Sequence, residues 1–182
     1  FQRWMQWQPP AHAWHAFVAF ERRHGETERA RQVLRRLVDV HPDIASWLKW
    51  AKFEERLGAV DRARAVFEAA VTALGDDANN EHFFLAFAQF EERHKEIERA
   101  RAIFKYALDH IPKHLADELY QQFVNFEKQH GERDGIEHVI VAKRRFQYEE
   151  ELKRNAKDYD TWFDYIRLEE EAGSEPPRVR EL

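Results

Sequence analysis

The tetrapeptide Glu28-Arg29-Ala30-Arg31 occurs again in this chain as Asp61-Arg62-Ala63-Arg64 and as Glu98-Arg99-Ala100-Arg101. The copies begin at residues 28, 61 and 98, so the spacing is 33 and then 37 residues. A weaker fourth copy, Asp134-Gly135-Ile136-Glu137, begins 36 residues further along. Self-similarity at such a period is the signature of a repeat protein, in which one supersecondary unit is stacked on the next.

Each tetrapeptide begins an amphipathic helix, which we call helix B. The alanine of the tetrapeptide opens its apolar stripe and is small enough to let two helices approach closely. The second and third copies repeat the pattern of the first. After the first copy, apolar residues follow the helical spacing i, i+3, i+4, i+7, i+8 at Ala30, Val33, Leu34, Leu37 and Val38.

A second helix, helix A, is predicted ahead of each tetrapeptide. This helix is recognised by three apolar residues spaced i, i+3, i+6, most of them aromatic. A glutamate directly follows the third of them. Residues at this spacing drift by only about 120° around a helix, so they form one stripe. The sets are Trp14, Phe17, Phe20 with Glu21; Trp47, Trp50, Phe53 with Glu54; Phe84, Phe87, Phe90 with Glu91; Tyr120, Phe123, Phe126 with Glu127; and Trp162, Tyr165, Leu168 with Glu169.

Turn-forming residues agree with two helices per unit. Gly25, Gly58 and Gly131 lie between helices A and B, and a Pro or Gly falls 12 residues after each of the first three helix B alanines. One hairpin cannot bury its own stripes, so we expect an all-α fold, a solenoid of stacked helical hairpins. We expect a single array that is a fragment of a longer one, with repeats at 10–42, 43–75, 77–112 and 114–155 and partial repeats at 1–8 and 157–182.

Two finer features of the array are predicted. Glu21, Glu54 and Glu91 should each face an Arg of their own helix B, because a short turn brings these helix ends together; the expected partners are Arg31, Arg64 and Arg101. Helix B of the fourth unit should be longer than the others, since residues 136–154 contain neither Gly nor Pro. We expect about 20 residues against about 15.

Composition excludes several function classes. Formal net charge is −5 with 35% charged residues, a balance unlike that of a domain dedicated to gripping nucleic acid. The chain has no Cys, which removes thiolate zinc sites and cysteine nucleophiles. No apolar run approaches the ~18 residues that span a bilayer. We expect a soluble intracellular protein with no membrane partner, small-molecule ligand or cofactor.

Metal binding, base stacking and catalysis are three alternative functions for residues of this chain. His12 with His15 and His110 with His114 have spacings that a helix could use for ligation, but no third ligand falls in step with either pair. The aromatic stripes recur in every unit, which favours a core over platforms for stacked bases. No Gly-rich phosphate loop or nucleophile–base signature is present. We therefore expect that the chain has no metal site and no catalytic residue, and that it is not an enzyme.

Lys143, Arg144 and Arg145 form one compact basic cluster. A contact with phosphate is one interpretation. The favoured one is a solvated helix face neutralised by i, i+4 pairs such as Arg145 with Glu149. The long helix should also project beyond the stack, with Phe146 and Tyr148 on an end that stands clear. We take these two residues and the basic cluster as the candidate partner contact.

The repeat unit resembles the half-a-TPR (HAT) repeat, a TPR-like hairpin that forms superhelices. The matching residues are the Trp and aromatic-x-x-aromatic-Glu of helix A and the acidic-Arg-Ala-Arg of helix B, which we take as structural signature residues. Longer strings are similar to the Crooked neck family of splicing factors: Arg3–Pro9 (RWMQWQP), Phe87–Glu92 (FAQFEE), Lys143–Glu151 (KRRFQYEEE) and Asp158–Tyr165 (DYDTWFDY). This resemblance runs over essentially the whole chain.

The resemblance implies a nuclear subunit of the NineTeen complex, which joins the spliceosome during pre-mRNA splicing. It implies a scaffold that binds other proteins, including a second, larger HAT-repeat protein and a Myb-related subunit, with direct RNA contact expected to be minor. Two alternatives stay open: a HAT-repeat scaffold of another RNA-processing complex, such as mRNA 3′-end cleavage, and an RNA-binding solenoid.

Overall fold

The computed structural model describes residues 3, 7, 9–112, 115–131 and 133–172. These residues hold nine α-helices, one short 3-10 helix (η1) and no strand, so the predicted all-α hairpin fold is confirmed. None of the described helices is long and apolar enough to cross a membrane. The elements are α2 (Ala11–Arg23), α3 (Thr27–Val40), α4 (Ile44–Arg56), α5 (Val60–Leu74), η1 (Gly75–Ala78), α6 (Glu81–Arg93), α7 (Ile97–His110), α8 (Asp117–His130), α9 (Arg133–Arg154) and α10 (Tyr159–Glu171).

Some sequence expectations fall outside the described residues. They are most of the partial repeat at 1–8, the last ten residues of the partial repeat at 157–182, and His114.

Side-chain caps start three of the helix A elements. The carboxylate of Asp43 accepts a hydrogen bond of 2.8 Å from the backbone N–H of Ser46. Asn80 and Asp158 cap α6 and α10 in the same way. Each cap satisfies a backbone donor that has no partner inside the helix, which defines where the helix begins.

The turns from helix A to helix B use a left-handed residue. Gly25 and Gly58 have φ of +74° and +72°, the region that glycine occupies without steric cost. Lys95 takes the same place in the third hairpin with φ of +63°. Gly131 differs, because its backbone is extended.

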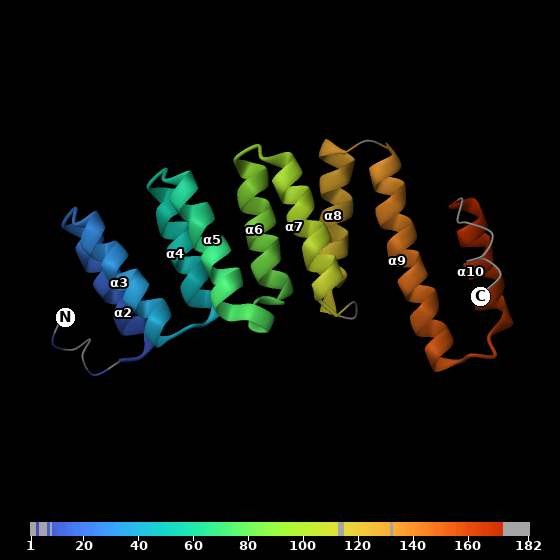
Figure 1. Cartoon of the computed structure of the whole chain (residues 1–182), viewed down its shortest axis with the longest axis horizontal. Helices are drawn as coiled ribbons and strands as arrows, with labels where there is room; N and C mark the ends of the chain where they lie inside the picture. Colours follow the sequence, from blue (N-terminus) through green and yellow to red (C-terminus); the bar gives the residue numbers. More distant parts are fainter. Residues whose placement is uncertain (1–2, 4–6, 8, 113–114, 132, 173–182) are drawn as a thin grey trace. The chain divides into compact units, whose positions relative to one another are not determined.

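The chain divides into two compact units, Phe1–Ala100 and Arg101–Leu182, with the boundary inside α7. In the first unit, α2 packs against α3 and α4 against α5 as antiparallel hairpins, and α4 also contacts α3 and α6 (Figure 1). In the second unit, α9 packs between α8 and α10. Stacked hairpins are therefore seen within each unit.

The aromatic stripes form the core, as the sequence predicted. Trp14 is 1% exposed, and its cluster with α3 residues also includes Phe53 from α4. The helix B alanines Ala30, Ala63 and Ala100 are fully buried. Consecutive hairpins therefore share one core, which no single hairpin could build alone.

The same packing step recurs at the later hairpins. Phe67 of α5 stacks on Phe87 of α6, with ring centroids 4.6 Å apart. In the second unit, Phe104 of α7 stacks on Phe123 of α8 at 5.1 Å. Each helix A thus turns its aromatic stripe toward the helix B that precedes it.

We predict that Lys95→Gly stabilises the chain by about 1 kcal/mol. A non-glycine residue in the left-handed region carries a steric cost of this order, and the exposed Lys95 side chain makes no hydrogen bond or ion pair within the described residues that would offset it. Urea denaturation measures the change. The reverse substitution, Gly58→Lys, should destabilise by a similar amount; equal midpoints for both variants and the parent would contradict the assignment.

We predict that Trp14→Ala lowers the free energy of unfolding by ~3 to 5 kcal/mol, the range for emptying a large aromatic site in a core. The indole N–H also loses its hydrogen bond of 3.0 Å to the Pro9 carbonyl. Thermal and urea unfolding measure the loss. Trp7→Ala is the matched control, since Trp7 is 84% exposed and its removal should leave stability nearly unchanged.

Candidate interaction surface

The last Arg of the repeated tetrapeptide holds a glutamate with a two-point hydrogen bond. In the first case, Nε and Nη2 of Arg31 donate to the carboxylate of Glu54 at 2.9 and 2.8 Å. Two parallel N–H···O bonds between a guanidinium and a carboxylate are stronger and more directional than a single bond. The other pairs of this kind are Arg64 with Glu91, Arg101 with Glu127 and Arg145 with Glu169.

These pairs join successive hairpins, so the prediction that each Glu faces its own helix B is wrong. Arg31 lies on α3, but it pairs with Glu54 on α4 and not with Glu21 on α2. The reason is the direction of the aromatic stripe. Glu54 directly follows Phe53, which packs into the core of the preceding hairpin, and so its carboxylate also faces that hairpin.

The glutamates of the pairs are buried, with exposed fractions of 2% for Glu54, 1% for Glu91, 2% for Glu127 and 0% for Glu169. A buried carboxylate without a partner carries a large desolvation cost, so each needs its Arg. Hydrogen bonding to Glu54 raises the pKa of Arg31, and hydrogen bonding to Glu91 raises the pKa of Arg64. The guanidinium groups therefore stay charged and compensate the carboxylates.

The first residue of the tetrapeptide orients the last. Glu28 forms an ion pair with Arg31 at 2.5 Å, and Asp61 forms one with Arg64 at 3.4 Å. Both are i, i+3 contacts on the helix surface, where such pairs stabilise weakly. The acidic residue thus holds the guanidinium in position, the buried alanine lets the helices approach, and the last Arg bonds to the next hairpin.

Helix α9 keeps this pairing but in a shifted position. It has 22 residues, against 14 or 15 for α3, α5 and α7, so the predicted long helix ending at Arg154 is confirmed. Arg145 is its thirteenth residue, whereas Arg31 is the fifth residue of α3. Counted from the other end, both stand nine residues before the last. The additional two turns therefore lie at the start of α9.

The expectation that Phe146 and Tyr148 stand clear of the stack is wrong, because the additional length is not at their end. Tyr148 packs on Tyr165 of α10 with ring centroids 5.8 Å apart, beside the buried Leu152. Phe146 and Lys143 are half-buried. The candidate partner contact predicted from sequence thus contains mostly residues that are engaged within the unit, with Arg144 exposed.

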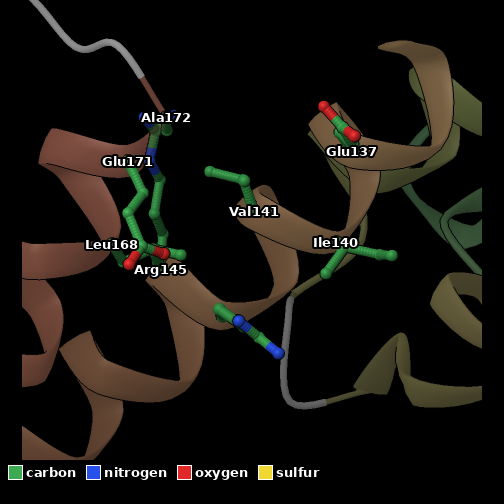
Figure 2. A pocket seen from close by; sticks show the side chains of 8 residues that line it. Glu137, Ile140, Val141, Arg145, Leu168, Glu171 and Ala172 are labelled. Atoms are coloured by element: carbon green, nitrogen blue, oxygen red, sulfur yellow. The ribbon is translucent and has the colours of Figure 1, made fainter. Parts of the chain in front are cut away.

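Residues 137–145 of α9 and the end of α10 line a pocket of about 360 Å³. Figure 2 shows Ile140 and Val141 on one side of it and Leu168 on the other. The charged lining is balanced, with two acidic residues, Glu137 and Glu171, and two basic ones, Arg144 and Arg145. Arg145 is already bound to Glu169, so this pocket offers a small apolar surface and no excess of charge.

Two further sequence hypotheses concern base stacking and metal binding. Most of the stripe residues considered as base-stacking platforms are buried, Trp14, Phe84 and Phe90 being 2% exposed or less, so they are core as predicted. Phe20, Trp50 and Trp162 are half-buried and pack against the core. No group of three or more His, Cys, Asp or Glu suited to a metal ion occurs among the described residues.

Sequence reasoning missed one feature, a basic groove between α2 and α4. Its cations come from two helices, so no run in the sequence reveals them. A comparison of equivalent positions between the repeats could have found Lys49 and Lys52, which replace uncharged residues.

Comparison with known proteins shows the same repeat. The family model described as "HAT (Half-A-TPR) repeat" matches residues 25–56, and "Pre-mRNA-splicing factor Syf1/CRNKL1 C-terminal HAT repeat" matches residues 55–164. The chain is 61% identical over 113 residues to "Crooked neck-like protein 1" of Dictyostelium discoideum and 59% identical over 113 residues to the mouse protein of that name. It is 50% identical over 105 residues to "Pre-mRNA-splicing factor cwf4" of Schizosaccharomyces pombe.

These matches cover 62%, 62% and 58% of this chain. The matched segment spans 16% of the length of each of the three relatives.

We predict that Arg64→Met destabilises the chain by about 3 kcal/mol, because it leaves Glu91 buried and unpaired. Adding Glu91→Gln should recover most of the loss. A double-mutant cycle by urea denaturation should give a coupling of at least ~1 kcal/mol for Arg64 with Glu91 and close to none for Arg64 with Glu54. If Arg64 were coupled to Glu54 and not to Glu91, the ion pair would lie within one hairpin, as the sequence predicted, and the pairing between hairpins would be wrong.

Proposed function

Because the chain belongs to the family of Syf1/CRNKL1 C-terminal HAT repeats of pre-mRNA splicing factors, we propose that it is a protein-interaction scaffold of the spliceosome. The observation that carries this proposal is the set of buried Arg–Glu pairs between hairpins. They hold successive hairpins in register within each unit while leaving the outward helix faces free. A stack built this way presents extended surfaces to other proteins.

The proposed partners are subunits of the NineTeen complex, including a second HAT-repeat protein and a Myb-related protein, and the proposed location is the nucleus. The relatives that are pre-mRNA splicing factors support partners within the spliceosome. Direct contact with RNA is proposed to be minor. A net charge of −5 and the burial of the aromatic stripes support a protein partner over a nucleic-acid backbone.

We also propose that the chain acts without catalysis. Glu54, Glu91, Glu127 and Glu169 are four of the five carboxylates that are buried among the described residues, the fifth being Glu21, and acid–base chemistry would draw on such groups. Each of these four is held by an Arg in a two-point hydrogen bond. A carboxylate fixed in this way serves structure, because its lone pairs and charge are already engaged.

We predict that the immobilised chain recovers spliceosomal proteins from nuclear extract, and that RNase treatment leaves the recovery unchanged. Mass spectrometry identifies the captured proteins. Arg64→Met should reduce recovery because it disturbs the stacking of hairpins, whereas Arg36→Gln, at an exposed position on α3, should not. Recovery that disappears with RNase would favour the RNA-binding solenoid, and recovery of 3′-end cleavage factors alone would favour another RNA-processing complex.

A further inference from the structure

A groove of about 350 Å³ lies between α2 and α4 in the first unit. Its rim carries four cations, Arg22 on α2 and Lys49, Lys52 and Arg56 on α4. Its floor is apolar and includes Val18 and Phe53. The groove therefore combines a positive rim with an apolar floor in a chain whose overall charge is negative.

The positive charge of the rim is uncompensated. No acidic residue lines the groove, and none of the four cations forms an ion pair or side-chain hydrogen bond with the described residues. By contrast, Arg31 and Arg64 each form an ion pair with a buried glutamate. Burial, and after it the charge of Lys49, lower the pKa of His15 in the groove lining, while Asp43 acts in the opposite direction.

Two of the four cations have an architectural explanation. Arg22 and Arg56 stand in the last turns of α2 and α4, where a positive charge interacts favourably with the helix dipole. Lys49 and Lys52 stand in the middle of α4, where the dipole offers no such benefit.

The repeat itself does not require Lys49 and Lys52. When the helices are aligned on Trp14, Trp47 and Phe84, the position of Lys49 is occupied by an alanine in both α2 and α6. The position of Lys52 is occupied by an alanine in α2 and a glutamine in α6. The other two helices therefore form with uncharged residues at these positions. We infer that Lys49 and Lys52 have a role other than stabilising the fold.

The charge of the rim and the apolar floor indicate which kind of ligand the groove can bind. Four unpaired cations complement carboxylates or phosphates. A single-stranded nucleic acid would also need exposed aromatic faces on which its bases stack, but Phe53 is only 8% exposed and lies in the core. The apolar floor is suited to an aliphatic side chain instead. A polypeptide that carries both acidic and aliphatic residues satisfies rim and floor together.

We propose that the groove between α2 and α4 binds an acidic, aliphatic segment of a partner protein. Acidic side chains of the segment face Arg22, Lys49, Lys52 and Arg56, and an aliphatic side chain rests on Val18 and Phe53. The site extends the scaffold function proposed above and rests on it in that the occupant is a protein.

The test uses the purified chain and a fluorescent synthetic peptide built of Glu-Glu-Leu units, with binding followed by anisotropy at two salt concentrations. The chain should bind this peptide, and higher salt should weaken the binding. The double variant Lys49→Ala with Lys52→Gln should bind about tenfold more weakly, since it removes half of the rim charge. This variant should fold normally, because α6 carries the same two residues at these positions.

The matched control is Arg36→Gln with Lys105→Gln, which removes two exposed cations that form no ion pair within the described residues. It should bind the peptide as the parent does. Equal losses in the two double variants, or equal binding of a Gln-Gln-Leu peptide, would overturn the proposal. So would preferential binding of oligouridylate RNA that the Lys49→Ala, Lys52→Gln variant loses. If the chain binds the peptide but recovers no spliceosomal protein from nuclear extract, the groove proposal is supported and the proposed scaffold function is wrong.

Discussion

The two-point bond between an Arg of helix B and a buried Glu of the next helix A is the contact on which the arrangement of the hairpins depends. A carboxylate that is 2% exposed or less cannot remain charged without a partner, so each Glu accepts only the register that brings an Arg to it. Aromatic packing supplies most of the stabilisation, but an apolar stripe tolerates sliding. The ion pair does not, because two parallel hydrogen bonds require a fixed geometry.

This division of tasks explains why the tetrapeptide is repeated so closely. Its acid steers the guanidinium, its alanine allows the helices to touch, and its last Arg reaches the next hairpin. Positions elsewhere on the helices are under no such demand. Lys49 and Lys52 can therefore replace the alanine or glutamine of other repeats without cost to the fold, which is how a stacked array acquires a surface specific to one repeat.

Helix α9 shows what happens when the motif is weak. The tetrapeptide in α9 is the fourth copy in the chain, and its last residue is Glu137 where the other copies have an Arg. Arg145, two helical turns later, pairs with Glu169 instead. The distance from the Arg to the end of the helix is the same as in α3, so the following hairpin position is preserved. The length difference is taken up before the ion pair, where α9 and the end of α10 leave a pocket.

The helices, their pairing into hairpins, the buried stripes and the length of α9 could be predicted from the sequence alone. These follow from local spacing, turn residues and the absence of helix breakers, all of which act over a few turns of one chain segment. The pairing of Arg31 with Glu54 and not with Glu21, and the packing of Tyr148 on Tyr165, became visible in the three-dimensional structure. The tertiary structure also gathered the cations of the groove from two helices. The reason is that helical periodicity marks which face is apolar but does not say which neighbour that face meets.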